Sequence, residues 1–118
     1  LLGGLGKNKR TTANICTPGT DVDIHSKKAT AHCINSTSKT YHEDDWVKVE
    51  VIVYSDSLVH HVIDNDTVLT YTNIRVGGDE VPSNYINKIG NPLKEGYISL
   101  QSEGHPVEFR NIKIKTNE

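Results

Sequence analysis

The sequence predicts an all-β fold, and an antiparallel β-sandwich is the architecture that suits it best. Apolar residues recur at every second position in several short segments, as they do in strands with one buried face. Turn-forming Gly, Pro, Asn and Asp residues separate these segments, and no segment shows the 3.6-residue apolar spacing of an amphipathic helix. The length of 118 residues suits one domain, covering residues 1–118.

The earlier strands are predicted at residues 29–35, 46–54, 57–64 and 67–72. In the second of them, WVKVEVIVY, valines alternate with other residues and share a face that we expect to pack on the core: Val47, Val49, Val51 and Val53. The third and fourth strands are predicted to form a tight hairpin. The intervening Asp64-Asn65-Asp66 tolerates the positive φ angles of a type I′ turn.

A long polar connection, residues 77–92, precedes the last two predicted strands. Loops of this length in compact domains are usually functional or mobile. The final strands are predicted in GYISLQS, residues 96–102, and VEFRNIKIKT, residues 107–116, joined by a corner at residues 103–106. Polar residues crowd both strands, so we expect them to line a groove on the concave face of the sandwich.

The last predicted strand has an irregular apolar pattern. Simple alternation places Val107 and Phe109 on one face, and Ile112 and Ile114 on the other. Either both faces of this strand are covered, or a bulge near Arg110-Asn111 shifts the register. The sequence leaves both alternatives open.

The net charge and the two cysteines limit which partners and which cell compartment we expect. A formal charge of −2 supplies no broad basic surface, so we do not expect a nucleic-acid partner. No apolar run approaches the roughly 20 residues that span a bilayer, so we expect no membrane span. Cys16 and Cys33 suit a disulfide in an oxidising compartment, with two unpaired buried thiols as the alternative. Zinc is disfavoured because neither cysteine belongs to a C-x-x-C pair.

The stretch GYISLQSEGHPVEFRNIKIK, residues 96–115, resembles the closing motif of the 3-keto-disaccharide hydrolase domain family. That motif runs Gly-x-Ile-x-Leu-Gln-x-His-Gly-x-x-Val-x-Phe-Arg-Asn-Ile. The segments RTTANICTPGTDV, HCINSTSKTYH and DDWVKVEVIVY resemble a secreted branch of the same family. The likeness covers about residues 9–115.

This resemblance implies a concanavalin A-like jelly roll, with carbohydrate bound on its concave face. The implied activity is hydrolysis of 3-keto-glycosides or disaccharides, without a cofactor. The alternative is a non-catalytic carbohydrate-binding or accessory module of an exported complex. Because many members come from Bacteroidetes-type bacteria and are exported, we expect a periplasmic, outer-membrane-associated or extracellular protein.

The sequence departs from the family pattern in two places. The histidine of the closing motif falls on Glu103, and the early strands that carry a Glu-x-Gln motif on the concave face have no counterpart. The chain also contains no methionine. We therefore expect a partial domain: either further residues precede Leu1, or another chain packs on the exposed edge of the sheet.

The candidate site residues follow from the resemblance and from side-chain chemistry. Glu103 and His32 are the candidate catalytic acid or base. A solvated turn residue and a hydrogen-bonded core histidine are their respective structural alternatives. The candidate substrate-binding side chains offer directed hydrogen bonds, or an aromatic face with a polar tip: Gln101, Arg110, His105, Tyr41, His42 and Lys39.

No metal site is predicted. Acidic residues cluster at residues 21–23, 43–45 and 64–66, but none of these clusters has an EF-hand spacing, and Asp is common in turns. His60 and His61 are adjacent in a predicted strand, so their side chains point to opposite faces and cannot chelate one metal together.

Overall fold

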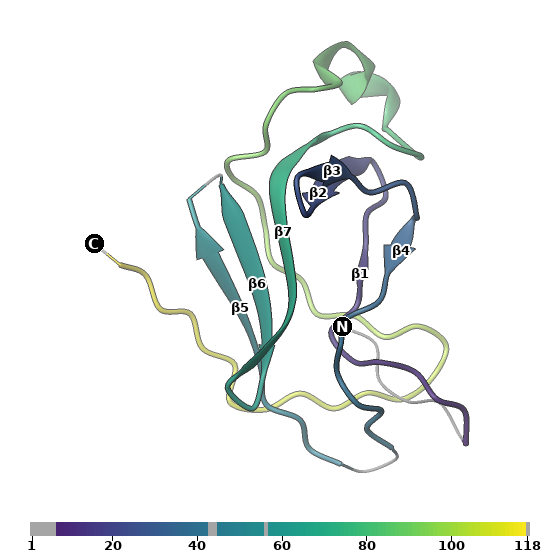
Figure 1. Cartoon of the computed structure of the whole chain (residues 1–118), viewed down its shortest axis with the longest axis vertical. Coiled ribbons are helices and arrows are strands. Elements are labelled where there is room, and N and C mark those ends of the chain that lie inside the picture. The colour runs from purple at the N-terminus through teal and green to yellow at the C-terminus, as the bar shows by residue number, and fades with distance from the viewer. Residues whose placement is uncertain (1–6, 43–44, 56, 118) are drawn as a thin grey trace.

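The computed structural model describes residues 7–42, 45–55 and 57–117 (Figure 1). It confirms the all-β antiparallel architecture, with a five-stranded sheet in the order β3-β2-β7-β6-β5 and a two-stranded ladder of β1 and β4. The strands are β1 (Ile15–Cys16), β2 (Thr20–Ile24), β3 (Lys27–Lys28), β4 (Cys33–Ile34), β5 (Val49–Tyr54), β6 (Leu58–Ile63) and β7 (Asp66–Val76).

The core lies between the five-stranded sheet and the segments that cross one of its faces. Its larger cluster buries Val22, Val59, Leu69 and Tyr71 under the half-buried side chains of Ile15, Ile24, Ala29, Ile34 and Ile74. A smaller cluster of Ala13, Ile63 and Val68 is covered by Tyr41, Val47 and Val49. The β1–β4 ladder therefore packs on the sheet as the second layer of a sandwich.

The β6–β7 hairpin confirms the predicted turn. Asp64 and Asn65 have φ angles of 47° and 70°, and the residues that flank them, Ile63 and Asp66, are paired. Positive φ at both central residues matches the right-handed twist of the flanking strands. The hairpin buries Val59, Ile63 and Leu69, and its second strand, β7, is the middle strand of the sheet.

The prediction for β5 was wrong in two respects. The strand begins at Val49 instead of Trp46, and Val51 and Val53 remain 53% and 59% exposed. β5 is an edge strand, and the smaller core cluster covers only its first residues. Only Val47 and Val49, at the start of the valine series, reach the smaller core cluster.

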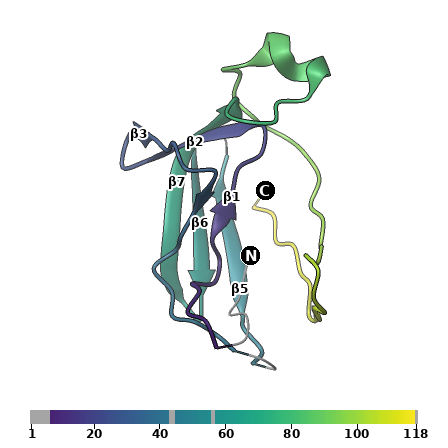
Figure 2. The ribbon, with the colours of Figure 1, turned by 90° about the vertical axis from the view of Figure 1, so that its right-hand side faces the viewer.

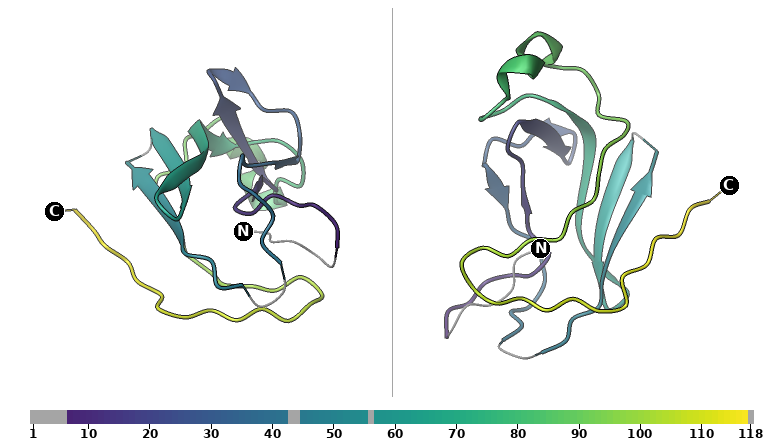
Figure 3. Two further views of the ribbon diagram at one scale, coloured as in Figure 1. Left: turned by 60° about the horizontal axis from the view of Figure 1, so that its bottom comes forward. Right: turned by 180° about the vertical axis from the view of Figure 1, so that it is seen from behind.

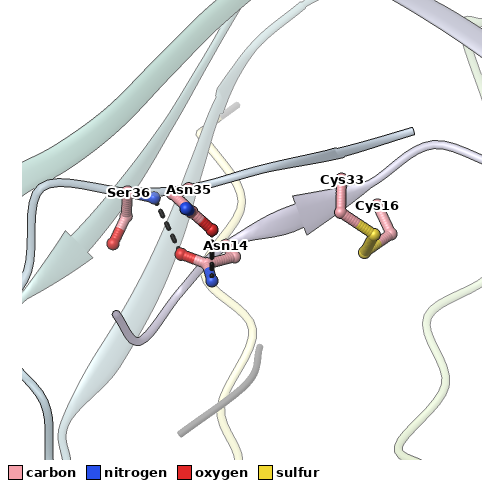
Figure 4. Close-up of a disulfide and its surroundings, with 5 residues drawn as sticks. All are labelled: Asn14, Cys16, Cys33, Asn35 and Ser36. Carbon is pink, nitrogen blue, oxygen red and sulfur yellow. Dashed lines mark hydrogen bonds between the residues drawn. A yellow bond between two sulfur atoms is a disulfide. The ribbon is translucent and has the colours of Figure 1, made fainter. Parts of the chain in front are cut away.

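The predicted strand at residues 29–35 shortens to β4, which pairs with β1 in the register Ile15↔Ile34 and Cys16↔Cys33. A disulfide joins the two cysteines, as predicted (Figure 4). At the other end of the ladder, the Asn14 side chain accepts a hydrogen bond from the Ser36 N–H at 2.7 Å. The same side chain donates to Asn35 Oδ1 at 3.2 Å. Side-chain bonds thus stabilise the ladder at both ends.

The connection at residues 77–92 contains a short 3₁₀ helix, η1 (Ser83–Lys88), which stands above the end of β7 in Figure 1. The helix has no buried residue. Backbone hydrogen bonds hold the connection at both ends: Gly77 N–H donates to the carbonyl of Gly19, just before β2, at 3.2 Å, and Val76 N–H in β7 donates to the Asn91 carbonyl at 3.0 Å. This long loop is consequently held in one place.

The two final strands were predicted wrongly, because residues 96–102 and 107–116 form no ladder. After the Leu93 N–H bond to the Ile74 carbonyl, the chain runs along one side of the molecule, away from the edges of the sheet (Figures 2 and 3). A strand requires a partner for its backbone groups, and no described segment supplies one here. We call residues 95–117 the closing segment.

The closing segment exposes its apolar residues. Tyr97, Ile98, Ile112 and Ile114 are between 65% and 105% exposed. Asn111 has a φ of 55°, so the extended backbone breaks at the position where the sequence required either a bulge or two covered faces. The regular alternation therefore does not continue past Asn111, but a β-bulge is a feature of paired strands and this segment pairs with no described strand.

Candidate functional site

The closing segment positions three of the candidate residues around a tight corner. Gly104 has a φ of 70°, and the Nδ1–H of His105 donates to the Glu103 carbonyl at 2.7 Å. A carbonyl oxygen only accepts, so this bond places the His105 proton on Nδ1. The Gln101 and Glu103 side chains are exposed, whereas His105 is half-buried.

Arg110 lies against the segment that precedes β5. Its guanidinium carbon is 4.0 Å from the centroid of the Trp46 ring, which is the geometry of a cation–π contact. Among the described residues, no hydrogen bond or ion pair joins Arg110 to Gln101 or Glu103. Arg110 therefore anchors the closing segment, and the three predicted groove residues are not joined by direct contacts.

His32 stands in a separate place, beside a polar cavity of about 30 Å³ that Thr17, Asp21, Thr30 and Asp79 also line. A cavity of that size holds about one water molecule. The Asp21 carboxylate in its wall pairs with the Lys28 ammonium at 3.1 Å. The His32 carbonyl accepts a hydrogen bond from the Thr17 N–H at 2.9 Å, which holds the backbone of His32 next to β1.

Lys39, Tyr41 and His42 belong to the loop between β4 and β5. The Lys39 ammonium lies 4.7 Å from the centre of the Tyr41 ring, and the ring packs on the smaller core cluster. Burial raises the pKa of the Tyr41 hydroxyl, and the nearby Asp64 carboxylate raises it further. Tyr41 is consequently fixed against the β6–β7 turn, and His42 is exposed.

A polar row on the sheet was not predicted from the sequence. His60 Nδ1 lies 2.7 Å from the Thr70 hydroxyl, and the Tyr54 ring meets the His60 ring edge-on at 5.8 Å. The pairing Ile52↔His60↔Thr70 places these groups on one face across β5, β6 and β7. A β-bulge between His61 and Val62 sets this register, and no residue pattern indicates that bulge.

A carboxylate–guanidinium pair lies on β2 and β7. Asp23 accepts hydrogen bonds from the Asn73 amide at 2.9 Å and from Arg75 at 3.1 Å. The Asn73 hydrogen bond, followed by those to Arg75 and its positive charge, lowers the pKa of the Asp23 carboxyl. The pair joins strands far apart in the sequence and has the character of a structural contact.

His61 is buried on the opposite face from His60, as predicted from their adjacency. Its Nδ1 lies 2.7 Å from the Ala13 carbonyl and its Nε2 lies 3.1 Å from the Tyr71 hydroxyl. The Nδ1–H donates to the carbonyl, which only accepts, and in the neutral ring that burial favours, Nε2 accepts from the Tyr71 hydroxyl. Burial lowers the pKa of His61 against the effect of the Ala13 bond, and it raises the pKa of Tyr71 to about 12.

The decisive comparison with known proteins is a family match over nearly the whole chain. A family described as the 3-keto-alpha-glucoside-1,2-lyase-like domain matches residues 3–115. The chain belongs to this family. No curated protein and no solved structure matches it.

Membership of the 3-keto-glucoside lyase-like family indicates a carbohydrate-related function. It confirms the resemblance carried by the closing segment and fits a carbohydrate ligand. In the part of the chain that the structure describes, no helix is long and apolar enough to cross a membrane.

A metal site in the 3-keto-glucoside lyase-like domain would need several His, Cys, Asp or Glu side chains close together. No three His, Cys, Asp or Glu side chains come close enough to hold a metal ion among residues 7–42, 45–55 and 57–117. Glu43 and Asp44, from one of the acidic clusters in the sequence, lie outside these residues.

Proposed function

We propose that this domain cleaves 3-keto-glucosides at the bond between C1 and the glycosidic oxygen. Support comes from one observation, the match of residues 3–115 to the lyase-like family. A ketone at C3 acidifies the hydrogen on C2, so a base can remove that proton and leave an enolate. When the enolate collapses, a C1–C2 double bond forms and the bond from C1 to the glycosidic oxygen breaks. The departing oxygen takes up a proton and leaves as an alcohol. Addition of water to this enone completes a net hydrolysis.

In this proposal Glu103 is the base or acid, with His32 as the second candidate. Glu103 is exposed beside the Gly104 turn, where a carboxylate can approach a bound sugar. Gln101 and Arg110 supply hydrogen bonds to the hydroxyl groups, and the Trp46 contact limits the orientations of Arg110. His105, Lys39, Tyr41 and His42 contribute to the rim of the sugar site.

A non-catalytic carbohydrate-binding module is the second candidate function. It is favoured by the separation of the two candidate catalytic groups: Glu103 lies at the corner of the closing segment, whereas His32 lies beside the β1–β4 ladder. A base and an acid that act on one substrate must both come within hydrogen-bond reach of it. A module that only binds has no such requirement.

We further propose that another β-segment, from this protein or from another chain, pairs with the closing segment. The support is its unpaired backbone together with the exposed side chains of Ile98, Phe109, Ile112 and Ile114. Extended segments with free N–H and C=O groups and apolar side chains readily accept a further strand. Pairing of this kind would also complete a face for the sugar.

We propose an exported, periplasmic or extracellular location as well. The support is the Cys16–Cys33 disulfide, whose two residues are both exposed. Glutathione and thioredoxin keep such bonds reduced in most cytosols, so a stable disulfide favours an oxidising compartment.

The test of the activity uses a 3-keto-α-linked glucose disaccharide, with product formation followed by NMR. We expect loss of the disaccharide, and a decrease of about 10²–10⁴-fold in rate for Glu103→Gln, which is the usual contribution of a general acid or base. Glu108→Gln, another exposed carboxylate of the closing segment, is the matched control. Binding without turnover would establish the binding module instead, and neither binding nor turnover would refute both functions.

A further inference from the structure

A second cavity, unrelated to the candidate sugar residues, opens between η1 and the ends of β2 and β7. It has a volume of about 240 Å³, is open to solvent on one side, and is lined mainly by Pro18, Thr20, Val76, Pro82, Tyr85 and Leu93. These residues come from four separate parts of the chain: the β1–β2 turn with the start of β2, the end of β7, η1 with the residue before it, and the return from η1. None of them is among the residues assigned above to the sugar.

Backbone hydrogen bonds hold the walls of this cavity in place. Gly19 N–H donates to the Asp79 carbonyl at 2.6 Å, and Gly90 N–H donates to the Val76 carbonyl at 2.8 Å. Tyr85 N–H bonds the Pro82 carbonyl at 2.8 Å. Because the walls are fixed before any ligand arrives, binding requires little ordering of the loop.

The lining favours an apolar ligand over a sugar. Proline, valine and leucine side chains offer no hydrogen bonds, and the Thr20 hydroxyl already faces the Pro18 carbonyl at 3.4 Å. A sugar would bury hydroxyl groups here without partners, at a cost of about 1–3 kcal/mol for each. A flat hydrocarbon ring has no such cost and can lie against the Tyr85 ring.

The size of the cavity limits the ligand to one ring. An apolar cavity of about 150 Å³ is known to hold benzene. The present volume of about 240 Å³ therefore leaves room for a six-membered aromatic ring with one small substituent. A bicyclic or larger ligand would extend into solvent.

A cation beside Tyr85 indicates the substituent. The Lys88 ammonium lies 4.9 Å from the centroid of the Tyr85 ring, in the last turn of η1. Lys88 forms no ion pair with any residue that the structure describes. A negatively charged group on the ligand would meet this unpaired charge as the ring contacts Tyr85.

We propose that this cavity binds a small aromatic carboxylate, with its ring against Tyr85, Pro82 and Leu93 and its carboxylate toward Lys88. The site does not depend on the sugar chemistry proposed above. Either proposal can fail without the other.

The test is an amide-resolved NMR titration of the whole chain with benzoate. We expect shifts confined to residues 18–20, 76, 82–88 and 93. Tyr85→Ala should weaken binding at least about fivefold through loss of the stacking surface. Lys88→Gln should weaken the binding of benzoate about two- to fivefold, the range of an exposed ion pair. It should leave the binding of the uncharged benzyl alcohol unchanged.

Tyr97→Ala and Lys115→Gln, both at exposed positions of the closing segment, are the matched controls and should bind as the parent does. Leu93→Trp fills the cavity and should abolish the shifts, which provides a test if Tyr85→Ala alters η1. Shifts located elsewhere, or none at millimolar benzoate, would overturn the proposal. Equal or tighter binding of glucuronate would overturn the aromatic class, and an equal effect of Lys88→Gln on both ligands would overturn the role of Lys88.

Discussion

The guanidinium of Arg110 rests on the ring of Trp46, with 4.0 Å between the guanidinium carbon and the ring centroid. The contact joins the closing segment to the residues that lead into β5. Trp46 is the only tryptophan in the sequence, so its fluorescence reports on this one contact.

Arg110→Ala should free the Trp46 ring and make it more accessible to acrylamide quenching. We expect a loss of about 0.5–1 kcal/mol in the docking of the closing segment, the range for exposed cation–π contacts. Faster proteolysis within residues 95–117 should accompany it. Lys113→Ala is the control from the same segment, and unchanged quenching in Arg110→Ala would show that the contact does not form in solution.

The Cys16–Cys33 disulfide closes a loop with a sequence separation of 17 residues. In the chain-entropy treatment, its removal by paired Cys16→Ala and Cys33→Ala substitutions should lower the free energy of unfolding by about 3 kcal/mol. Denaturant unfolding of both proteins measures this difference. Thiol titration of the unreduced protein should find no free cysteine, and two reactive thiols would contradict the pairing.

His61 predicts a pH dependence of stability. Its folded pKa is lowered by burial, so the unfolded chain binds the proton more readily than the folded protein. Stability should be fully present above the unfolded pKa of about 6.5 and should fall as the pH drops below it, by at most about 1.4 kcal/mol per pH unit.

The measurement for this prediction is urea unfolding between pH 5 and pH 7.5. His61→Gln should flatten the slope in this range, although it also lowers the stability at pH 7.5 by disturbing the bonds to Ala13 and Tyr71. His25→Gln, at an exposed position between β2 and β3, is the matched control. A slope that survives His61→Gln would assign the dependence to another group.

Exposed apolar side chains on β5 and on the closing segment should promote self-association of the 118-residue chain. Val53 is 59% exposed and Ile112 is 65% exposed. Val53→Lys and Ile112→Lys together should reduce association at high concentration with little change in the melting temperature, since neither side chain belongs to the core. Sedimentation velocity measures this, with Ser99→Lys as the control for added charge, and unchanged association in the double variant would contradict the prediction.

The sequence was most informative where structure is local. Asp64 and Asn65 predicted the β6–β7 turn because both residue types tolerate positive φ, and the alternation around them predicted the paired strands. How exposed a side chain is depends on contacts with residues far away in the sequence. The alternation of Val51 and Val53 matches that of Val49, yet they stay uncovered because the smaller core cluster, which Val49 contacts, lies only at the start of β5.

The candidate site was harder to predict for the same reason. An unbroken ladder from Ile63↔Asp66 would place His60 opposite Leu69, but the bulge after His61 places it opposite Thr70. The alternation in TDVDI could have predicted β2, since Thr20, Val22 and Ile24 share one face. The strands expected in the closing segment have the right pattern, but pattern alone cannot supply the neighbour with which a strand must pair.

The position of β2 beside β7 affects how the chain reaches this structure. The β5, β6 and β7 strands are neighbours in sequence and in space, whereas the Asp23–Asn73 bond that joins β2 to β7 spans 50 residues. Local hairpins close in microseconds, and long-range pairing comes later because the intervening chain loses more entropy. We therefore expect the meander of β5–β7 to form first and to serve as the template on which residues 10–34 dock. Oxidation of Cys16 and Cys33 before docking would reduce the number of conformations open to residues 10–34. The supply of oxidant in the compartment would then influence the folding rate as well as the final stability.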